Sequence, residues 1–188
     1  FALLIVLVSG CQIAETPEGV VQNREPEVLV NDLDTPWSID FLPDGRMIFT
    51  ERPGRVNIFD GTSKEVIAEI DVAEVSESGL LGVAVDPEFE ENNHIYLYYT
   101  YKNKTMVNRV SRFTLKDDQL KDEVVLIDGI PSAKFHDGGR IKFGPEDKLY
   151  VTTGDATEPS SAQDIQSLAG KILRLNKDGS IPQDNPFN

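Results

Sequence analysis

Three kinds of feature are scarce in this sequence. A single cysteine, Cys11, excludes an intrachain disulfide. No segment shows sustained helical periodicity, and residues 163–169 are expected to form at most a short turn. Basic residues are few, because 18 Lys and Arg stand against 32 Asp and Glu, for a formal net charge of −14. This charge argues against nucleic acid as a partner and against electrostatic docking onto anionic lipid.

The remaining composition is that of an ordinary globular domain. The chain has 188 residues, of which 39% are hydrophobic and 27% charged, and this length is enough for one medium domain with a core. An acidic surface suits calcium and uncharged soluble substrates, although most such charge is simply a solvated exterior.

The longest apolar run lies at the N-terminus, from Phe1 to Val8. It is shorter than the roughly 20 residues of a membrane span, but it fits the apolar region of a secretory signal. Small residues directly before Cys11 resemble the lipobox of bacterial lipoproteins. We therefore expect residues 1–11 to be a signal segment truncated at its start, and residues 12–27 to be a polar linker. The protein is then exported, periplasmic or at the cell surface, with a lipid on Cys11 as its membrane anchor. The alternative is a buried N-terminal strand with an inert thiol.

From Val28 onward the chain repeats itself loosely. Each of three units has an apolar strand, a proline turn and then further β-branched or aromatic strands. The turns open at Pro43, Pro87 and Pro145, which lie 44 and 58 residues apart. A period in this range, with several short strands per unit, is typical of propeller blades. The sequence therefore predicts an all-β propeller over residues 28–188.

Three units are too few to close an ordinary propeller ring, which has about four to eight four-stranded blades. We therefore expect residues 28–188 to be the N-terminal part of a longer propeller, with about its first three blades. A three-blade domain that dimerises into a ring is the alternative.

The residues that suggest chemistry gather around one of the two histidines. His136 lies in a glycine-rich loop, where a neutral imidazole is a natural general base near pH 7. Asp155 ends the next hairpin and could orient that imidazole, while Arg140 could pair with a carboxylate or buttress the loop. Glu77 precedes a glycine turn and faces a central cavity or decorates an exposed loop. On spacing alone, a lone loop histidine is more often a surface residue.

Six motifs follow one another along the chain in a specific order. They are Pro36-Trp-Ser-Ile39, Thr50-Glu-Arg-Pro-Gly-Arg55, Glu77-Ser-Gly-Leu-Leu-Gly82, His136-Asp-Gly-Gly-Arg140, Thr153-Gly-Asp155 and Gly179-Ser-Ile-Pro-Gln-Asp-Asn-Pro-Phe187. In this combination the chain resembles the soluble glucose/sorbosone dehydrogenase family, which are pyrroloquinoline-quinone (PQQ)-dependent aldose dehydrogenases built as six-bladed β-propellers. The resemblance covers essentially all residues from Val28 onward.

The resemblance implies a reaction and a set of roles. His136 removes the proton of the anomeric hydroxyl while the C1 hydride passes to PQQ, and Asp155 holds His136 in orientation. Glu77 and Arg140 are expected at the cofactor. The aldose becomes a lactone, and an external acceptor takes the electrons. Calcium is expected beside the quinone with ligands from later blades, so no metal ligand is assigned here and the 188-residue chain is expected to be inactive alone.

Two other functions fit a propeller. A calcium-dependent propeller lactonase predicts turnover of lactones without a quinone. A non-enzymatic binding module predicts that His136 is dispensable. The glycine-rich His136 loop argues against the binding module, because an ordinary structural blade does not need it.

Overall fold

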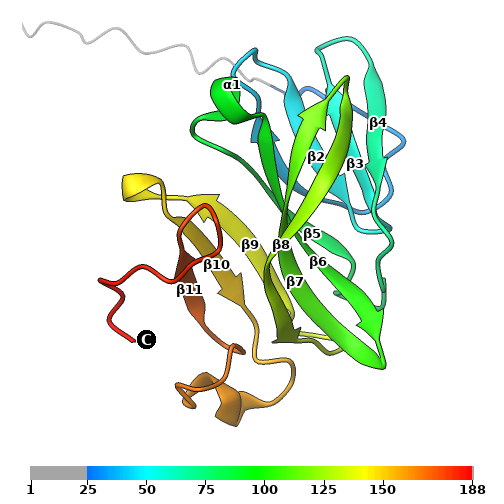
Figure 1. The fold of residues 1–188 in the computed structure, drawn as a ribbon. Helices are drawn as coiled ribbons and strands as arrows, with labels where there is room; N and C mark the ends of the chain where they lie inside the picture. The colour runs from blue at the N-terminus through cyan, green and yellow to red at the C-terminus, as the bar shows by residue number, and fades with distance from the viewer. Residues whose placement is uncertain (1–24, 188) are drawn as a thin grey trace, which may run out of the picture.

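The computed structural model describes residues 25–187. The predictions for the signal segment 1–11, with Cys11, and for residues 12–24 of the linker lie outside the described residues. No helix within residues 25–187 is long and apolar enough to cross a membrane. The described chain forms three antiparallel sheets that follow one another along the sequence and lie side by side (Figure 1).

Each sheet is a meander in which every strand pairs with the next one along the chain. The first contains β1 (Pro36–Phe41), β2 (Met47–Glu51), β3 (Arg55–Phe59) and β4 (Lys64–Glu69). The second contains β5 (Leu80–Val85), β6 (His94–Asn103), β7 (Thr105–Lys116) and β8 (Gln119–Pro131). The third contains β9 (Gly138–Phe143), β10 (Leu149–Thr153) and β11 (Ile172–Leu175). Short helical turns are α1 (Phe89–Asn92), η1 (Pro145–Asp147) and η2 (Pro159–Ala162).

The all-β propeller fold is confirmed, and the repeated prolines lie where the repeat predicted a turn. Pro43, Pro87 and Pro145 each follow the first strand of a sheet and lie in its connection to the second strand. Residues 163–169 form only turns and bends, as expected. The three sheets are arranged as consecutive blades, while the total of six blades stays a prediction.

The outer strands β4 and β8 are the elements that the sequence repeat did not reveal. Both lie at the outer edge of a sheet, and most residues of β8 are exposed. An exposed strand does not need the apolar alternation that marks a half-buried one, so its pattern is weak.

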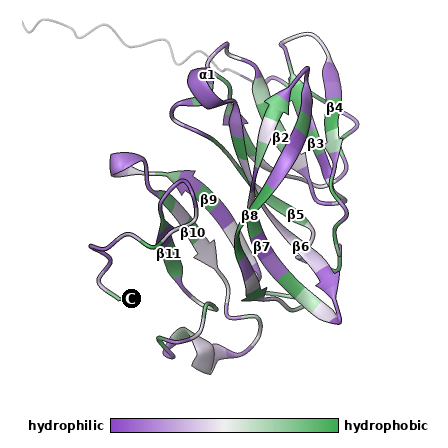
Figure 2. Ribbon diagram, in the orientation of Figure 1, coloured by the Kyte–Doolittle hydropathy of each residue, from purple (hydrophilic) through white to green (hydrophobic). Residues whose placement is uncertain are grey.

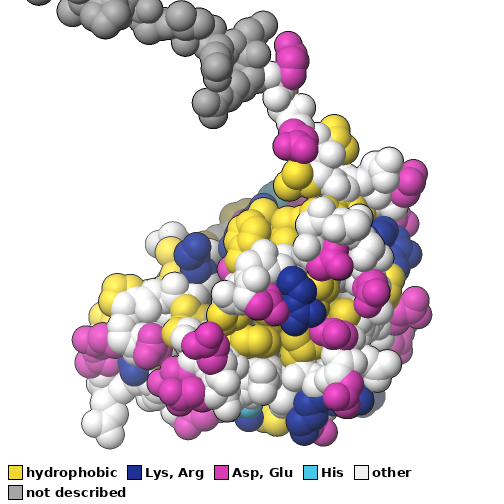
Figure 3. All heavy atoms as spheres, turned by 90° about the horizontal axis from the view of Figure 1, so that it is seen from above, with side chains coloured by type: hydrophobic (Ala, Val, Ile, Leu, Met, Phe, Trp, Pro, Cys, Tyr) yellow, Lys and Arg dark blue, Asp and Glu magenta, His cyan; other side chains and the backbone are white. Residues whose placement is uncertain are grey.

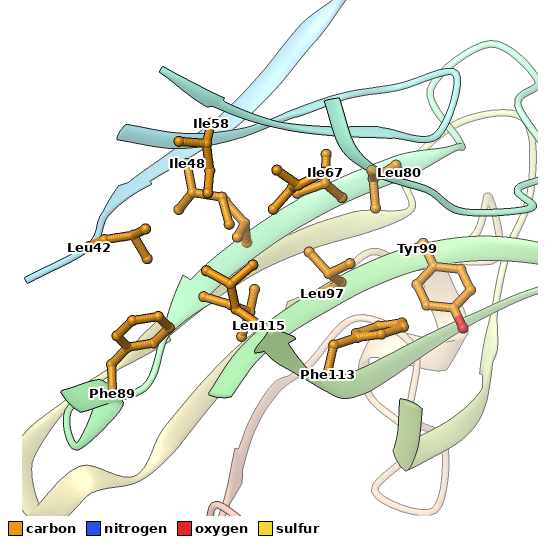
Figure 4. Packing of buried hydrophobic residues seen from close by; sticks show 13 residues of the cluster. Leu42, Ile48, Ile58, Ile67, Leu80, Phe89, Leu97, Tyr99, Phe113 and Leu115 are labelled. Atoms are coloured by element: carbon orange, nitrogen blue, oxygen red, sulfur yellow. The ribbon is translucent and has the colours of Figure 1, made fainter. Parts of the chain in front are cut away.

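The core lies in two layers, one on each side of the second sheet. Strand β6 shows the arrangement, because successive side chains of a strand point to opposite faces. Ile95, Leu97 and Tyr99 belong to the cluster toward the first sheet, and Figure 4 shows Ile48, Ile58 and Ile67 across this cluster from Leu97 and Tyr99. Tyr96 and Tyr98 pack toward the third sheet with Ile141, Leu149 and Val151. Figure 2 shows hydrophobic segments along the strands and a hydrophilic α1.

The first strand of the second sheet, β5, packs closely against the first strands of the other two sheets, β1 and β9. Because β5 is an edge strand, its free N–H groups need partners. The Asp40 carboxylate accepts a hydrogen bond from the main-chain N–H of Val85 at 2.8 Å. On the other side, a Cβ added at Gly82 would lie 2.2 Å from the carbonyl oxygen of Gly139. This close packing fixes the start of β9, and thus the loop before it, relative to the other sheets.

Candidate active site

The His136 loop, residues 132–137, connects β8 to β9. Strands β9 and β10 pair antiparallel, with Gly138 opposite Thr153. The residues before β9 and those after β10 therefore lie at the same end of the third sheet. This pairing explains how His136 and Asp155, 19 positions apart, come together.

His136 has an unusual backbone conformation. Its φ is +65°, in the left-handed region that non-glycine residues rarely adopt. A Cβ added at Gly154 would lie 1.6 Å from the carbonyl oxygen of His136, so only glycine fits there. The N–H of Ala156 donates to the same carbonyl at 3.2 Å. The residues directly after β10 thus contact the His136 main chain and hold it in this conformation. Backbone strain of this kind is concentrated at functional sites.

His136 and Asp155 form a hydrogen-bonded pair. Nδ1 of His136 lies 2.9 Å from Oδ1 of Asp155, which also accepts the main-chain N–H of Thr157 at 2.9 Å. The hydrogen bond from His136 lowers the pKa of Asp155 below its usual range. An ionised carboxylate at this position makes Nδ1 the protonated nitrogen of the neutral imidazole. Nε2 then carries a lone pair, and the imidazole is 61% exposed.

Glu77 contacts the main chain of the base candidate. Its Oε2 accepts a hydrogen bond from the N–H of His136 at 2.7 Å, and its own N–H donates to the carbonyl of Lys134 at 3.1 Å. Glu77 belongs to residues 73–79, which we call the Glu77 loop and which lead into β5. The structure therefore brings together three of the residues selected from the sequence. His136 and Asp155 meet through their side chains, and Glu77 meets the main chain of His136.

Arg140 lies on β9 but contacts a different sheet. Its guanidinium carbon lies 4.0 Å from the centre of the Trp37 ring, and Nη1 donates to the Trp37 carbonyl at 3.3 Å. Trp37 is on β1, so the pair joins the inner strands of the first and third sheets. Within residues 25–187, Arg140 is bound to Trp37 and not to the His136 pair.

A buried polar chain that the sequence did not reveal runs under the His136 loop. The Asp137 carboxylate is 2% exposed and accepts hydrogen bonds from Nδ2 of Asn108 at 3.1 Å and from the N–H of Ala133 at 3.2 Å. Burial raises the pKa of Asp137 above its ordinary value. Asn108 in turn accepts a hydrogen bond from Thr100 at 2.6 Å. The only signal in the sequence was that Thr100 on β6 and Asn108 on β7 are polar residues at inward-facing positions.

The described residues do not supply a metal centre. Within residues 25–187, no three His, Cys, Asp or Glu side chains gather as a metal site. One hollow is lined by residues 53–55 and 69–71, and a second by residues 69–73 with Tyr99 and Tyr101. Neither includes His136 or Asp155, and the His136 imidazole is 61% exposed on the described chain.

Comparison with known proteins gives one consistent result. The family model "Glucose / Sorbosone dehydrogenase" matches residues 33–188. Quinoprotein glucose dehydrogenase B of Acinetobacter calcoaceticus is 35% identical over 98% of this chain and 47% of its own length. Aldose sugar dehydrogenase YliI of Escherichia coli K12 is 34% identical over 86% of this chain and 46% of its own length.

A solved structure shows the same fold. The PQQ-bound form of an aldose sugar dehydrogenase from Streptomyces coelicolor matches with a TM-score of 0.81 and 33% identity, over 86% of this chain and 50% of that one. The chain thus spans about half the length of the curated relatives it matches. Because the family model covers most of the chain and the relatives agree with it, this chain belongs to the glucose/sorbosone dehydrogenase family.

Proposed function

We propose that the protein oxidises aldose sugars at C1 to lactones, with PQQ as the hydride acceptor and an external acceptor for the electrons. The observation that carries the proposal is the His136–Asp155 pair, with 2.9 Å between Nδ1 and Oδ1, in a chain of this family. Since the chain spans about half of each relative, the proposal concerns the complete protein.

The contribution of this chain is proton transfer. The C1 hydroxyl of the sugar donates its proton to Nε2 of His136, because Nδ1–H is engaged by Asp155. The ionised Asp155 stabilises the resulting imidazolium and keeps the ring in orientation, as in other carboxylate–histidine pairs. The chemistry that a bound quinone supplies is acceptance of the C1 hydride, a two-electron oxidation that leaves the lactone.

Among the described residues, Arg140 is suited to bind a carboxylate of the planar, anionic quinone. Arg140 is exposed on the inner strand β9, and the hydrogen bond to Trp37 engages one of its nitrogens. A guanidinium has five N–H donors, so Arg140 keeps donors for a carboxylate of the cofactor. Calcium remains part of the proposal, with ligands expected from later blades.

The test is an assay of the complete protein with PQQ and calcium. Reduction of a redox dye is measured with a panel of aldoses, and we expect cofactor-dependent reduction with at least one sugar. Absence of such reduction with every sugar would overturn the proposal. Hydrolysis of lactones without PQQ would identify a lactonase instead.

We also propose that the protein is exported and bound to the membrane through a lipid on Cys11. The proposal rests on the apolar run and the small residues before that cysteine. A Cys11→Ser variant is expected to move from the membrane fraction to the soluble fraction. Equal amounts of variant and wild type in the membrane fraction would contradict the anchor.

A further inference from the structure

The Glu77 loop and the His136 loop come from different sheet junctions, yet they bind each other at two points. The carboxylate of Glu77 accepts the His136 N–H at 2.7 Å, and the Glu77 N–H donates to the Lys134 carbonyl at 3.1 Å. A hydrogen bond to an ionised acceptor is roughly twice as strong as one between neutral groups. The Glu77 side chain therefore acts on the main chain of the candidate base.

The Glu77 loop can hold the His136 main chain in place because hydrogen bonds and close packing hold the loop itself. Ser78 is 0% exposed, and its Oγ accepts the N–H of Val75 at 2.8 Å and donates to the Ala73 carbonyl at 2.9 Å. A Cβ added at Gly79 would lie 2.5 Å from the Arg52 carbonyl oxygen, so the loop lies directly on the end of β2. A rigid support of this kind is what precise positioning requires.

A buried chain of hydrogen bonds ties the same two loops together from below. The N–H of Gly79 donates to Oγ1 of Thr100 at 3.3 Å, and Thr100 donates to Asn108 at 2.6 Å. Asn108 donates to the Asp137 carboxylate at 3.1 Å. Buried hydrogen bonds thus connect the two loops inside the fold, and exposed ones connect them at its surface. Among the exposed ones, the bond to the Glu77 carboxylate is the one made by His136 itself.

His136 needs such support because of its backbone. A non-glycine residue at φ +65° is disfavoured and persists only where the surroundings hold it. A shift of about 1 Å in a catalytic group can cost roughly 100-fold in rate. We propose that Glu77 is a positioning residue, whose carboxylate holds the His136 main chain so that Nε2 faces the substrate. The inference rests on the proposed function, in which His136 is the base.

Glutamine and alanine substitutions separate positioning from charge. In Glu77→Gln the side-chain carbonyl can still accept the His136 N–H, whereas Glu77→Ala removes the acceptor. Asp71 is an exposed carboxylate on the same connection between β4 and β5. Asp71→Asn is therefore a matched control for the loss of one negative charge at this end of the molecule.

The first measurement does not depend on catalysis. The complete protein is labelled with ¹⁵N-histidine, and exchange of the His136 amide proton is followed by NMR. The His94 amide, which donates to Oδ1 of Asn92 at 2.9 Å, is an internal reference. We expect His136 exchange to rise roughly tenfold or more in Glu77→Ala, and to rise less in Glu77→Gln. Unchanged exchange in Glu77→Ala would overturn the proposal.

The second measurement is kinetic. With the sugar found in the PQQ assay, we expect kcat to fall roughly 10- to 100-fold in Glu77→Ala, with KM nearly unchanged. Glu77→Gln should restore most of the activity, and Asp71→Asn should match wild type. Equal rises in KM in both Glu77 variants, with His136 exchange unchanged, would make Glu77 a sugar contact instead. If the wild type oxidises no sugar, the proposed function fails while the amide measurement still decides the contact.

Discussion

In the proposed reaction His136 is the base, and the two nitrogens of its imidazole have different tasks. Since Nδ1 is bound to Asp155 at 2.9 Å, only Nε2 is free to take a proton. We expect His136→Gln to lower kcat by roughly 10²- to 10⁴-fold, the usual contribution of general base catalysis. Asp155→Asn should lower kcat less, because the base itself remains. Steady-state kinetics of the complete protein with PQQ measures both changes.

The control is Glu158→Gln, which removes an exposed carboxylate three positions from Asp155. It should leave kcat unchanged. A His136→Gln variant with wild-type kcat would show that the base lies elsewhere in the protein. Circular dichroism of each variant checks that the sheets are intact.

Gly154 is the residue on which the His136 conformation depends most directly. A Cβ there would lie 1.6 Å from the His136 carbonyl, so Gly154→Ala must displace the loop or the end of β10. Gly61 is the opposite case, because its φ is +96° but a Cβ added there meets nothing within 4 Å. We expect urea unfolding to show a larger loss for Gly154→Ala than for Gly61→Ala, which should cost about 1 kcal/mol. Equal losses would mean that the clash is relieved without cost.

Glu51 carries a buried negative charge at the end of β2. Its side chain is 0% exposed and accepts hydrogen bonds from Nε of Arg55 at 3.0 Å and Nδ2 of Asn57 at 3.0 Å. The main-chain N–H of Asp34 is a third donor. Burial alone would raise the pKa of Glu51, but these hydrogen bonds, from Arg55 above all, lower the pKa to about 2 from 4.5.

This shift predicts how stability depends on pH. Because the unfolded chain holds the Glu51 proton more tightly, the ionised carboxylate stabilises the fold fully above pH 4.5, and this stabilisation is lost as the pH falls toward 2. Glu51→Gln should therefore reduce the free energy of unfolding by about 1–3 kcal/mol at pH 7. The difference from wild type should shrink in acid. Urea titrations at several pH values test this, and a difference that stays constant would contradict it.

At the scale of strands, β6 is the centre of the packing because both of its faces are buried. Leu97 is 0% exposed and lies between the first and second sheets, as Figure 4 shows. We expect Leu97→Ala to cost about 2–5 kcal/mol in the free energy of unfolding, through lost burial and a cavity. Val124→Ala on β8, where Val124 is 42% exposed, should cost less than about 0.5 kcal/mol. Similar costs for the two variants would show that β6 is not central.

The inner elements of the fold followed from the sequence, whereas the outer strands did not. Turn chemistry at Pro43, Pro87 and Pro145 is local, so it could be recognised residue by residue. Strand β8 carries charged residues on its exposed face and gave no clear alternation. Only its pairing with β7 in the structure locates this strand.

The candidate site shows the same division. His136 and Asp155 could be selected because residue type and loop position suggested chemistry and the ordered motifs, through the resemblance, assigned it to them. The bond from the His136 N–H to Glu77 joins residues 59 positions apart and depends on how two sheets pack. No local pattern encodes such a contact. The resemblance placed Glu77 at the cofactor, which stays a prediction, and gave no sign of its bond to the His136 main chain.

At the scale of the whole chain, acidic residues outnumber basic ones, 32 to 18. The formal net charge is −14, and Figure 3 shows Asp and Glu spread over one face with fewer Lys and Arg among them. A net negative potential attracts cations over roughly 10 Å at moderate salt. We expect the negative charge of this chain to act on the electron acceptor of the proposed reaction, so the acceptor's charge should affect the rate.

We therefore expect a cationic redox dye to be reduced faster than an anionic dye of similar potential when salt is low. The ratio of the two rates should fall toward one as the ionic strength rises from about 0.01 M to about 0.3 M, because salt screens the interaction. An uncharged dye is the control and should show little dependence on salt. Because the chemical step at His136 is common to all three dyes, stopped-flow measurement of dye reduction isolates the encounter. Faster reduction of the anionic dye at low salt would mean that the acceptor docks at a basic area, against the charge of this chain.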